Sequence, residues 1–215
     1  HLAEVLAEMG RSVTIGASGY GSPRAEAATL APAGPLDPAE WGDEPAMLRE
    51  RLPEVPLVVG RRRVLAAALA YENDPDGVLL MDDGFQHLPL ATALSLVIDP
   101  VRPESARCLP VGPYREPRGF GRRRADAVLE TGGGEGWRVE YSPLVWSDGP
   151  PTGGLLCALG NPARFTEAAG PVPGPVVLKN DHDPLTERDL LSPFDPTLTV
   201  GVTEKDWIKL RRRPD

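Results

Sequence analysis

Two kinds of segment alternate along this chain. Residues 2–9 place apolar side chains at helical spacing before the stop signal Gly10, and the alanine-rich residues 62–71 also predict a helix. Between and after these helices lie short, mostly apolar segments that predict strands at 11–17, 55–60, 78–81, 94–98 and 125–130. Helices that alternate with such strands indicate an α/β fold whose parallel sheet is covered on both faces.

The pattern changes after the glycine run at 132–134. Residues 137–141 and 143–146 predict extended ribbons, and Gly149-Pro150-Pro151 follows as a break. A second α/β unit comes next, with strands expected at 155–159, 176–179 and 198–202, and helices near 162–169, at 187–191 and from 204. We therefore predict a larger core domain over residues 1–136, a β-ribbon linker over 137–151 and a smaller α/β domain over 152–215.

Composition narrows the classes of function. The 23 basic and 31 acidic residues give a net charge of −8, which argues against general nucleic-acid binding. No uninterrupted apolar run approaches the ~20 residues that a bilayer crossing requires. Two cysteines cannot form a disulfide framework and suit a reducing cytoplasm. With three histidines and no Cys-x-x-Cys, a structural zinc site is not expected.

The strand expected at 78–81 ends in two carboxylates, within the string Asp82-Asp83-Gly84-Phe85-Gln86-His87. A parallel sheet gathers ligands at the carboxyl ends of its strands, where a carboxylate can hold Mg²⁺ beside phosphates. The alternative is that Asp83-Gly84 simply makes a hairpin turn. A plain turn needs neither the second carboxylate nor the amide and the imidazole. We therefore predict a metal site at Asp82 and Asp83, with Gln86 and His87 nearby.

Further motifs follow this string in a fixed order. They are LPVGPYREP at 109–117, GNP at 160–162 and TEKD at 203–206, with GYG at 19–21 and GDEP at 42–45 upstream. Together with Asp-Asp-Gly-Phe-Gln-His, this ordered set resembles the tetraacyldisaccharide 4′-kinase family over nearly the whole chain. Three departures bear on substrate binding: Ser18 stands where the family usually has arginine, Asp183 where it often has histidine, and residues 103–106 replace a glycine-asparagine stretch.

The resemblance implies a P-loop-kinase-like fold and ATP-dependent phosphorylation of the 4′-hydroxyl of a tetraacyldisaccharide 1-phosphate in lipid A biosynthesis. It implies ATP and Mg²⁺ as cofactors and a glycolipid partner, with peripheral attachment at the cytoplasmic face of the bacterial inner membrane. Two alternatives stay open. One is a non-catalytic paralogue that binds glycolipid or a protein partner. The other is a phosphatase or another Mg²⁺ enzyme that uses the same acidic strand end without ATP.

Candidates for the acid–base chemistry lie far apart in the sequence. His182 follows the strand expected at 176–179, although a surface-loop histidine is an alternative. The resemblance implies that His182 works with Asp43, because a carboxylate can orient the imidazole and stabilise its protonated form. Asp43 could equally be the N-cap of the helix expected near residue 45. The resemblance also implies that Arg115 and Glu116 position nucleotide or metal, against the alternative of a salt-bridged turn.

Arginine triplets occur at 61–63, 122–124 and 211–213 of this acidic chain. The default interpretation of each triplet is a solvated face. A second interpretation is electrostatic docking on an anionic membrane surface, where each basic residue contributes ~1 kcal/mol.

The motif Gly-x-x-x-x-Gly-Lys-Ser/Thr occurs nowhere in the 215 residues. In the family, a helix and a strand like those expected at 2–9 and 11–17 come directly after the phosphate loop. We therefore expect the phosphate loop to lie before residue 1, and we expect a gap in the sheet beside the strand at 78–81. We also expect no measurable ATP-dependent kinase activity from these residues alone.

Overall fold

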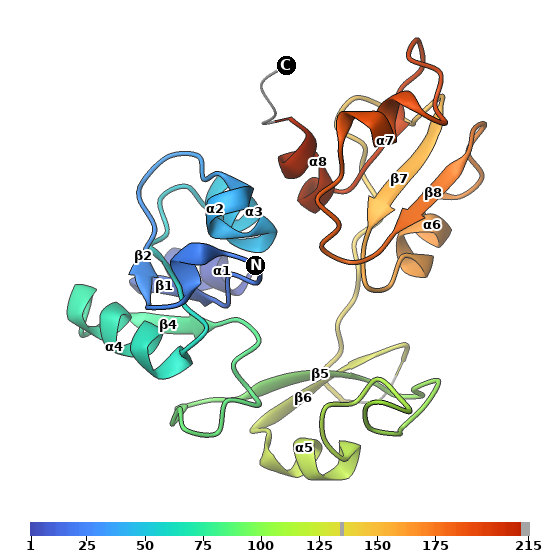
Figure 1. Cartoon of the computed structure of the whole chain (residues 1–215). Coiled ribbons are helices and arrows are strands. Elements are labelled where there is room, and N and C mark those ends of the chain that lie inside the picture. Colours follow the sequence, from blue (N-terminus) through green and yellow to red (C-terminus); the bar gives the residue numbers. More distant parts are fainter. Residues whose placement is uncertain (134–135, 212–215) are drawn as a thin grey trace. The chain divides into compact units, whose positions relative to one another are not determined.

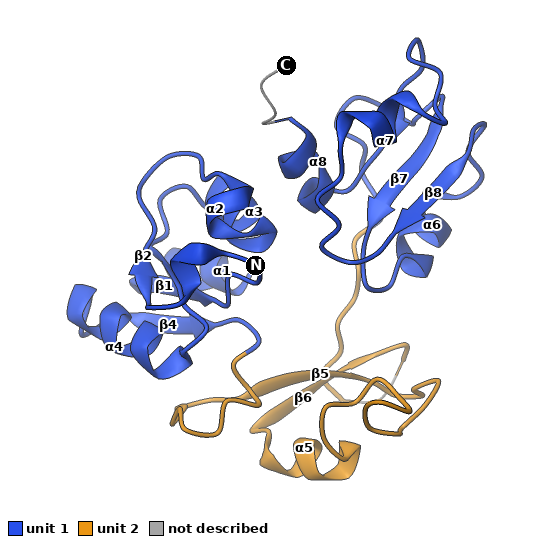
Figure 2. Ribbon diagram, viewed as in Figure 1, with its two compact units in different colours: residues 1–83, 143–215 blue, residues 84–142 orange. Residues whose placement is uncertain are grey.

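The computed structural model of this protein describes residues 1–133 and 136–211 and confirms the α/β class (Figure 1). The chain divides into two compact units (Figure 2). Residues 1–83 and 143–215 form unit 1, and residues 84–142 form unit 2. Unit 1 holds two mainly parallel sheets and unit 2 holds one two-stranded sheet.

A four-stranded sheet organises the first part of unit 1, in the order β2-β3-β1-β4. Strand β1 (Val13–Ala17) is buried along its whole length and pairs in parallel with β3 (Leu57–Val59) and β4 (Val78–Met81). The short β2 (Thr29–Leu30) pairs antiparallel with β3. Strand β4 is an edge strand of this sheet, and no strand of the described residues pairs with its outer side.

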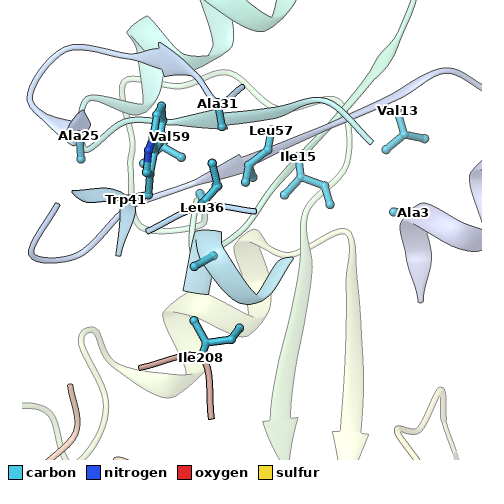
Figure 3. Close-up of a cluster of buried hydrophobic side chains, with 12 residues drawn as sticks. Ala3, Val13, Ile15, Ala25, Ala31, Leu36, Trp41, Leu57, Val59 and Ile208 are labelled. Carbon is cyan, nitrogen blue, oxygen red and sulfur yellow. The ribbon is translucent and has the colours of Figure 1, made fainter. Parts of the chain in front are cut away.

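Helices pack around this sheet and enclose its core. They are α1 (Leu2–Glu8), the 3₁₀ helix η1 (Pro23–Ala25), α2 (Pro38–Trp41), α3 (Asp43–Arg51) and α4 (Arg63–Asn73). Figure 3 shows the core cluster, in which Ile15, Leu57 and Trp41 lie with Ile208 from α8 (Glu204–Leu210). Burial of an Ile side chain contributes about 1.5–3 kcal/mol, so this contact ties the last described helix to the first sheet.

A three-stranded sheet organises the second part of unit 1. Strand β7 (Gly154–Ala158) is fully buried and lies between β8 (Val176–Lys179) and β9 (Val200–Gly201), both parallel to it. Helices α6 (Ala163–Ala169) and α7 (Glu187–Leu191) connect these strands in the order that the sequence predicts.

Unit 2 contains the parallel pair β5 (Leu96–Pro100) and β6 (Ala127–Thr131), with α5 (Arg118–Arg124) between them in the chain. The ribbon strands predicted at 137–141 and 143–146 are wrong. Only an isolated bridge from Glu130 to Arg138 forms there within the described residues. Trp137 and Val145 are 77% and 82% exposed, so no apolar surface recruits a pairing strand. The predicted domain boundaries after residues 136 and 151 stay a prediction; the compact units instead divide after 83 and 142.

Candidate active site

The carboxyl ends of the parallel strands in unit 1 gather polar residues at one sheet edge. Ser18 follows β1, Arg61 comes shortly after β3, and Asp82 follows β4. Because β1, β3 and β4 run parallel, these positions share the edge at which ligands of α/β sheets bind. A hollow of about 450 Å³ opens there and is lined by Ser18, Tyr20, Gly21 and Arg61.

The turn after β4 is not a hairpin, because β4 pairs in parallel with β1. Asp83 adopts a left-handed backbone conformation with φ of 51°, which costs a non-glycine residue about 1–2 kcal/mol. Arg63, only 4% exposed, donates from Nη2 to the carbonyl oxygen of Asp82 at 2.6 Å. The turn is therefore held by a buried arginine of α4, and the hairpin alternative is wrong.

Asp82 and Asp83, which follow β4, lie near each other and near the charged side chains of Glu44 and Arg63. Burial by the surrounding protein, followed by the carboxylates of Asp83 and Glu44, raises the pKa of Asp82, while the Arg63 guanidinium opposes the shift. The Asp82 side chain still keeps exposed surface that a ligand can reach. Within residues 1–133 and 136–211 no group of three or more metal-binding side chains forms. A pair of carboxylates nevertheless fits Mg²⁺, which usually takes one or two carboxylates besides phosphate oxygens and water.

Asp43 and His182 meet although 139 positions separate them. His182 Nδ1 lies 3.2 Å from Asp43 Oδ2, and the side chains are 26% and 16% exposed. The His182 ring packs against the Tyr20 ring, with centroids 4.6 Å apart. His182 also has a positive φ of 60°, a strained conformation that clusters at functional sites. His182 lies in a turn with 26% of its side chain exposed, and the structure pairs it with Asp43; its catalytic role stays a prediction.

The first residue of α3 is Asp43 itself, and the N-cap position belongs to Gly42. No side chain makes a cap hydrogen bond at this helix end. The cap alternative for Asp43 is therefore wrong, because its carboxylate faces His182 instead.

A buried lysine completes the surroundings of Asp43. Lys209 Nζ lies 3.3 Å from Asp43 Oδ2 and 3.1 Å from Asp206 Oδ1, and donates to the carbonyl oxygen of Asp183 at 3.0 Å. The side chains of Lys209 and Asp206 are 4% and 0% exposed. Sequence reasoning treated residues 203–206 as a helix start and missed Lys209. The only signal was the spacing of Asp206 and Lys209, which places both on one face of α8.

A second lysine of α8 supports the outer side of His182. Lys205 Nζ lies 2.9 Å from Asp181 Oδ1 and 3.6 Å from Glu44 Oε1. Asp181 Oδ2 in turn lies 3.7 Å from His182 Nε2. Burial alone would raise the pKa of Asp181, but the hydrogen bond and the charge of Lys205, together with His182, outweigh it and lower the pKa.

The remaining predicted residues belong to unit 2. Gln86 Nε2 donates to Glu116 Oε1 at 3.3 Å, and the same oxygen lies 2.7 Å from Arg124 Nη2. The Arg124 guanidinium also lies 4.3 Å from the centre of the Phe85 ring. The motifs at 82–87 and 109–117 are thus linked through one arginine of the 122–124 triplet. Of the other two predicted residues, His87 is half-buried and Arg115 is exposed in the bend before α5.

Comparison with known proteins shows which family this chain is similar to. The sequence profile described as "Tetraacyldisaccharide-1-P 4′-kinase" matches residues 1–145. The tetraacyldisaccharide 4′-kinase of Pseudomonas putida is 37% identical over 98% of this chain and 68% of its own length. That of Anaeromyxobacter sp. Fw109-5 is 32% identical over 95% and 67%. The crystal structure of LpxK from Aquifex aeolicus in complex with ATP has a TM-score of 0.70 and 25% identity, over 97% of this chain and 72% of that one.

Proposed function

Because the chain belongs to the tetraacyldisaccharide 4′-kinase family, we propose that it phosphorylates the 4′-hydroxyl of a tetraacyldisaccharide 1-phosphate with ATP as donor. The observation that carries this proposal is the contact between Asp43 and His182 at 3.2 Å, in the unit that also holds Asp82 and Asp83. An acid–base pair and two carboxylates at a strand end are the parts that phosphoryl transfer to a hydroxyl needs.

His182 is the proposed base. When Nδ1–H donates to Asp43 Oδ2, the lone pair on Nε2 is left to accept the proton of the sugar hydroxyl. The Asp43 carboxylate then stabilises the imidazolium that forms. The His182 ring also packs against the Tyr20 ring at an interplanar angle of 32°, which supports the orientation of the imidazole.

Asp82 and Asp83 are the proposed Mg²⁺ ligands, and a bound Mg²⁺ would supply positive charge beside the phosphates. Glu44 adds negative charge near them, so a divalent cation relieves repulsion between carboxylates at this strand end. Gln86, His87, Arg115 and Glu116 are the proposed nucleotide-side residues. Glu116 is held by Arg124, which supports its use as a fixed contact and not a mobile one.

The proposed partner is the glycolipid substrate, met at the cytoplasmic face of the bacterial inner membrane by peripheral attachment. Among the described residues, no helix has both the length and the apolar character that a bilayer crossing requires.

Phosphate transfer from ATP to the 4′-hydroxyl of tetraacyldisaccharide 1-phosphate tests the proposal directly. We propose that the 215 residues alone give no transfer, because they contain no Gly-x-x-x-x-Gly-Lys-Ser/Thr, and that a chain extended with such a loop before residue 1 does. In the active form, His182→Ala is expected to lower turnover about 10²–10⁴-fold with little change in ATP affinity.

Three outcomes decide between the candidates. Unchanged turnover in His182→Ala would remove His182 from the mechanism. Strong transfer by the 215 residues alone would show that another segment holds the phosphates. Glycolipid binding without transfer by the extended chain would favour the non-catalytic paralogue.

A further inference from the structure

One carboxylate oxygen of Asp43 faces two partners. Asp43 Oδ2 lies 3.2 Å from His182 Nδ1 and 3.3 Å from Lys209 Nζ. Lys209 is nine-tenths buried or more, with 4% of its side chain exposed, so its ammonium is paired within the protein instead of with water. Burying a lysine is costly unless its charge is paired. The partners of Lys209 therefore indicate what this residue does beyond packing.

Asp206 is the fixed end of this arrangement. Its Oδ2 accepts from the backbone N–H of Ala158 at 3.0 Å and from the hydroxyl of Thr203 at 2.7 Å, and its Oδ1 faces Lys209. Ala158 lies in the buried strand β7, so Asp206 cannot turn away. Lys209 donates in addition to the carbonyl oxygen of Asp183, within the loop that carries His182.

Asp43 is the movable end. Its carboxylate contacts His182 on one side and Lys209 on the other, and the lysine is the partner that Asp206 anchors. Without the ammonium, nothing bridges the Asp43 carboxylate to the anchored Asp206. The anchored Asp206 would hold its place, and Asp43 would turn away from His182.

We propose that Lys209 is a positioning residue, which holds the Asp43 carboxylate against His182 Nδ1 by bridging it to Asp206. This inference concerns the same pair as the proposed function and names a residue on which that pair depends. The charged groups around His182 are then Asp43 from α3, Asp181 in its own loop, and Lys205 and Lys209 from α8, with Glu44 beside Lys205. Of these groups, Lys209 is the cation that contacts Asp43 itself.

The side-chain nitrogen resonances of His182 test the proposal in the 215-residue chain. ¹⁵N spectra at alkaline pH distinguish a neutral ring protonated at Nδ1 from one protonated at Nε2, the form that free histidine favours. The chain has three histidines, so the loss of one signal set in His182→Gln assigns the resonances. Asp43→Ala defines the spectrum of a ring without its carboxylate.

In the unaltered protein we expect the Nδ1–H form to dominate. Lys209→Met keeps the length of the side chain and removes its charge, and its His182 spectrum is expected to shift to that of Asp43→Ala. The matched control is Lys179→Met, which breaks a Lys–Asp pair with Asp189 in the same unit and is expected to leave the His182 spectrum unchanged.

Because Lys209→Met leaves Asp206 buried and unpaired, that variant can fail to fold. The double variant Asp206→Asn/Lys209→Met removes both charges, and the amide oxygen that it introduces can still accept from the backbone N–H of Ala158. Its His182 spectrum is also expected to match that of Asp43→Ala. An unchanged Nδ1–H form in the folded variants would overturn the proposal. So would an unaltered protein in which Nε2–H dominates, or recovery of Nδ1–H in the double variant alone. None of these results depends on phosphate transfer, so failure here is distinct from failure of the proposed function.

Discussion

Two aspartates, Asp99 in unit 2 and Asp43 in unit 1, contact basic side chains from distant segments and differ in what surrounds them. In unit 2, Asp99 is 3% exposed and accepts from Tyr114 Oη at 2.6 Å, Arg118 Nε at 2.8 Å and Arg122 Nη1 at 2.5 Å. In unit 1, Asp43 faces one histidine and one lysine. Both aspartates join segments that are distant in the sequence, but of the two only Asp43 has a histidine as a partner.

The difference shows how a charged cluster that stabilises a fold can be told from one suited to chemistry. Burial alone would raise the pKa of Asp99, but the hydrogen bonds from Tyr114, Arg118 and Arg122 outweigh it and lower the pKa. Arginine keeps its charge at every accessible pH. Arg118 and Arg122 of α5 therefore stay charged opposite Asp99 and hold α5 against β5. Asp43 instead contacts the imidazole of His182, the kind of side chain that serves as a general base in catalysis.

We expect the largest effect when the contacts of Lys209 with Asp43 and Asp206 in unit 1 are removed. Lys209→Met should lower the free energy of unfolding by about 3–5 kcal/mol, because it leaves Asp206 as an uncompensated buried charge. Urea unfolding followed by tryptophan fluorescence measures this loss. Lys179→Met, which breaks a more exposed pair, should cost far less. Equal losses in the two variants would show that burial of Lys209 adds nothing.

A smaller effect is expected from the cluster of unit 2. Asp99→Asn keeps the shape of the side chain but turns an amide donor toward arginine donors, and charge-assisted hydrogen bonds contribute about 1.5–3 kcal/mol each. We expect unit 2 to lose about 2–3 kcal/mol, measured as faster amide hydrogen exchange in β5 and β6. The exposed Glu140→Gln is the control. Amide protection that persists in Asp99→Asn would mean that the contacts of Asp99 with α5 are dispensable for stability.

Acid should weaken a third carboxylate contact, in α7. Hydrogen bonds from Lys179 and Thr186 lower the pKa of Asp189 to about 2. A lowered pKa in the folded state contributes stability that is present above the unfolded-state pKa and is lost as the pH falls from about 4 toward 2. The contribution is about 2 kcal/mol, and Asp189→Asn should remove it. Unfolding free energies of both proteins between pH 6 and 3 should therefore converge on acidification; parallel curves would contradict this.

The smallest expected effect is a difference in stability between substitutions of Arg124 and of its neighbour Arg123. Arg124 pairs with Glu116 and lies over Phe85, whereas Arg123 is exposed. Arg124→Gln should cost about 1–2 kcal/mol, and Arg123→Gln should stay within about 0.5 kcal/mol. Thermal unfolding of both variants measures the contrast. A neutral Arg124→Gln would show that the contacts of Arg124 with Glu116 and Phe85 add no stability.

The solvated-face interpretation was wrong for part of the triplets at 61–63 and 122–124, for a physical reason. Arg63 is buried under the turn after β4, while Arg61 and Arg62 are exposed. Arg211 is exposed and forms an ion pair with Glu50, and residues 212 and 213 lie outside the described residues. Three successive positions on a helix or turn point in different directions, so one of them can turn inward without any change in composition.

Strands and helices were more predictable, because their signals are local. The strand expected at 78–81 is β4, and the helix expected at 187–191 is α7. The ribbons at 137–146 failed because an extended segment becomes a strand only when another backbone pairs with it, and the sequence does not say which one does.

The order of residues was therefore sufficient for the α/β class, for most element boundaries and for the family. It also picked out Asp43 and His182, but only through the resemblance, since neither residue has a local signal stronger than a cap or a loop. Folding alone decided that they touch. Ile208 packs into the first core, and this brings α8, with Lys209, against α3. A contact across 139 positions depends on the packing of whole layers, and no local period in a sequence encodes it.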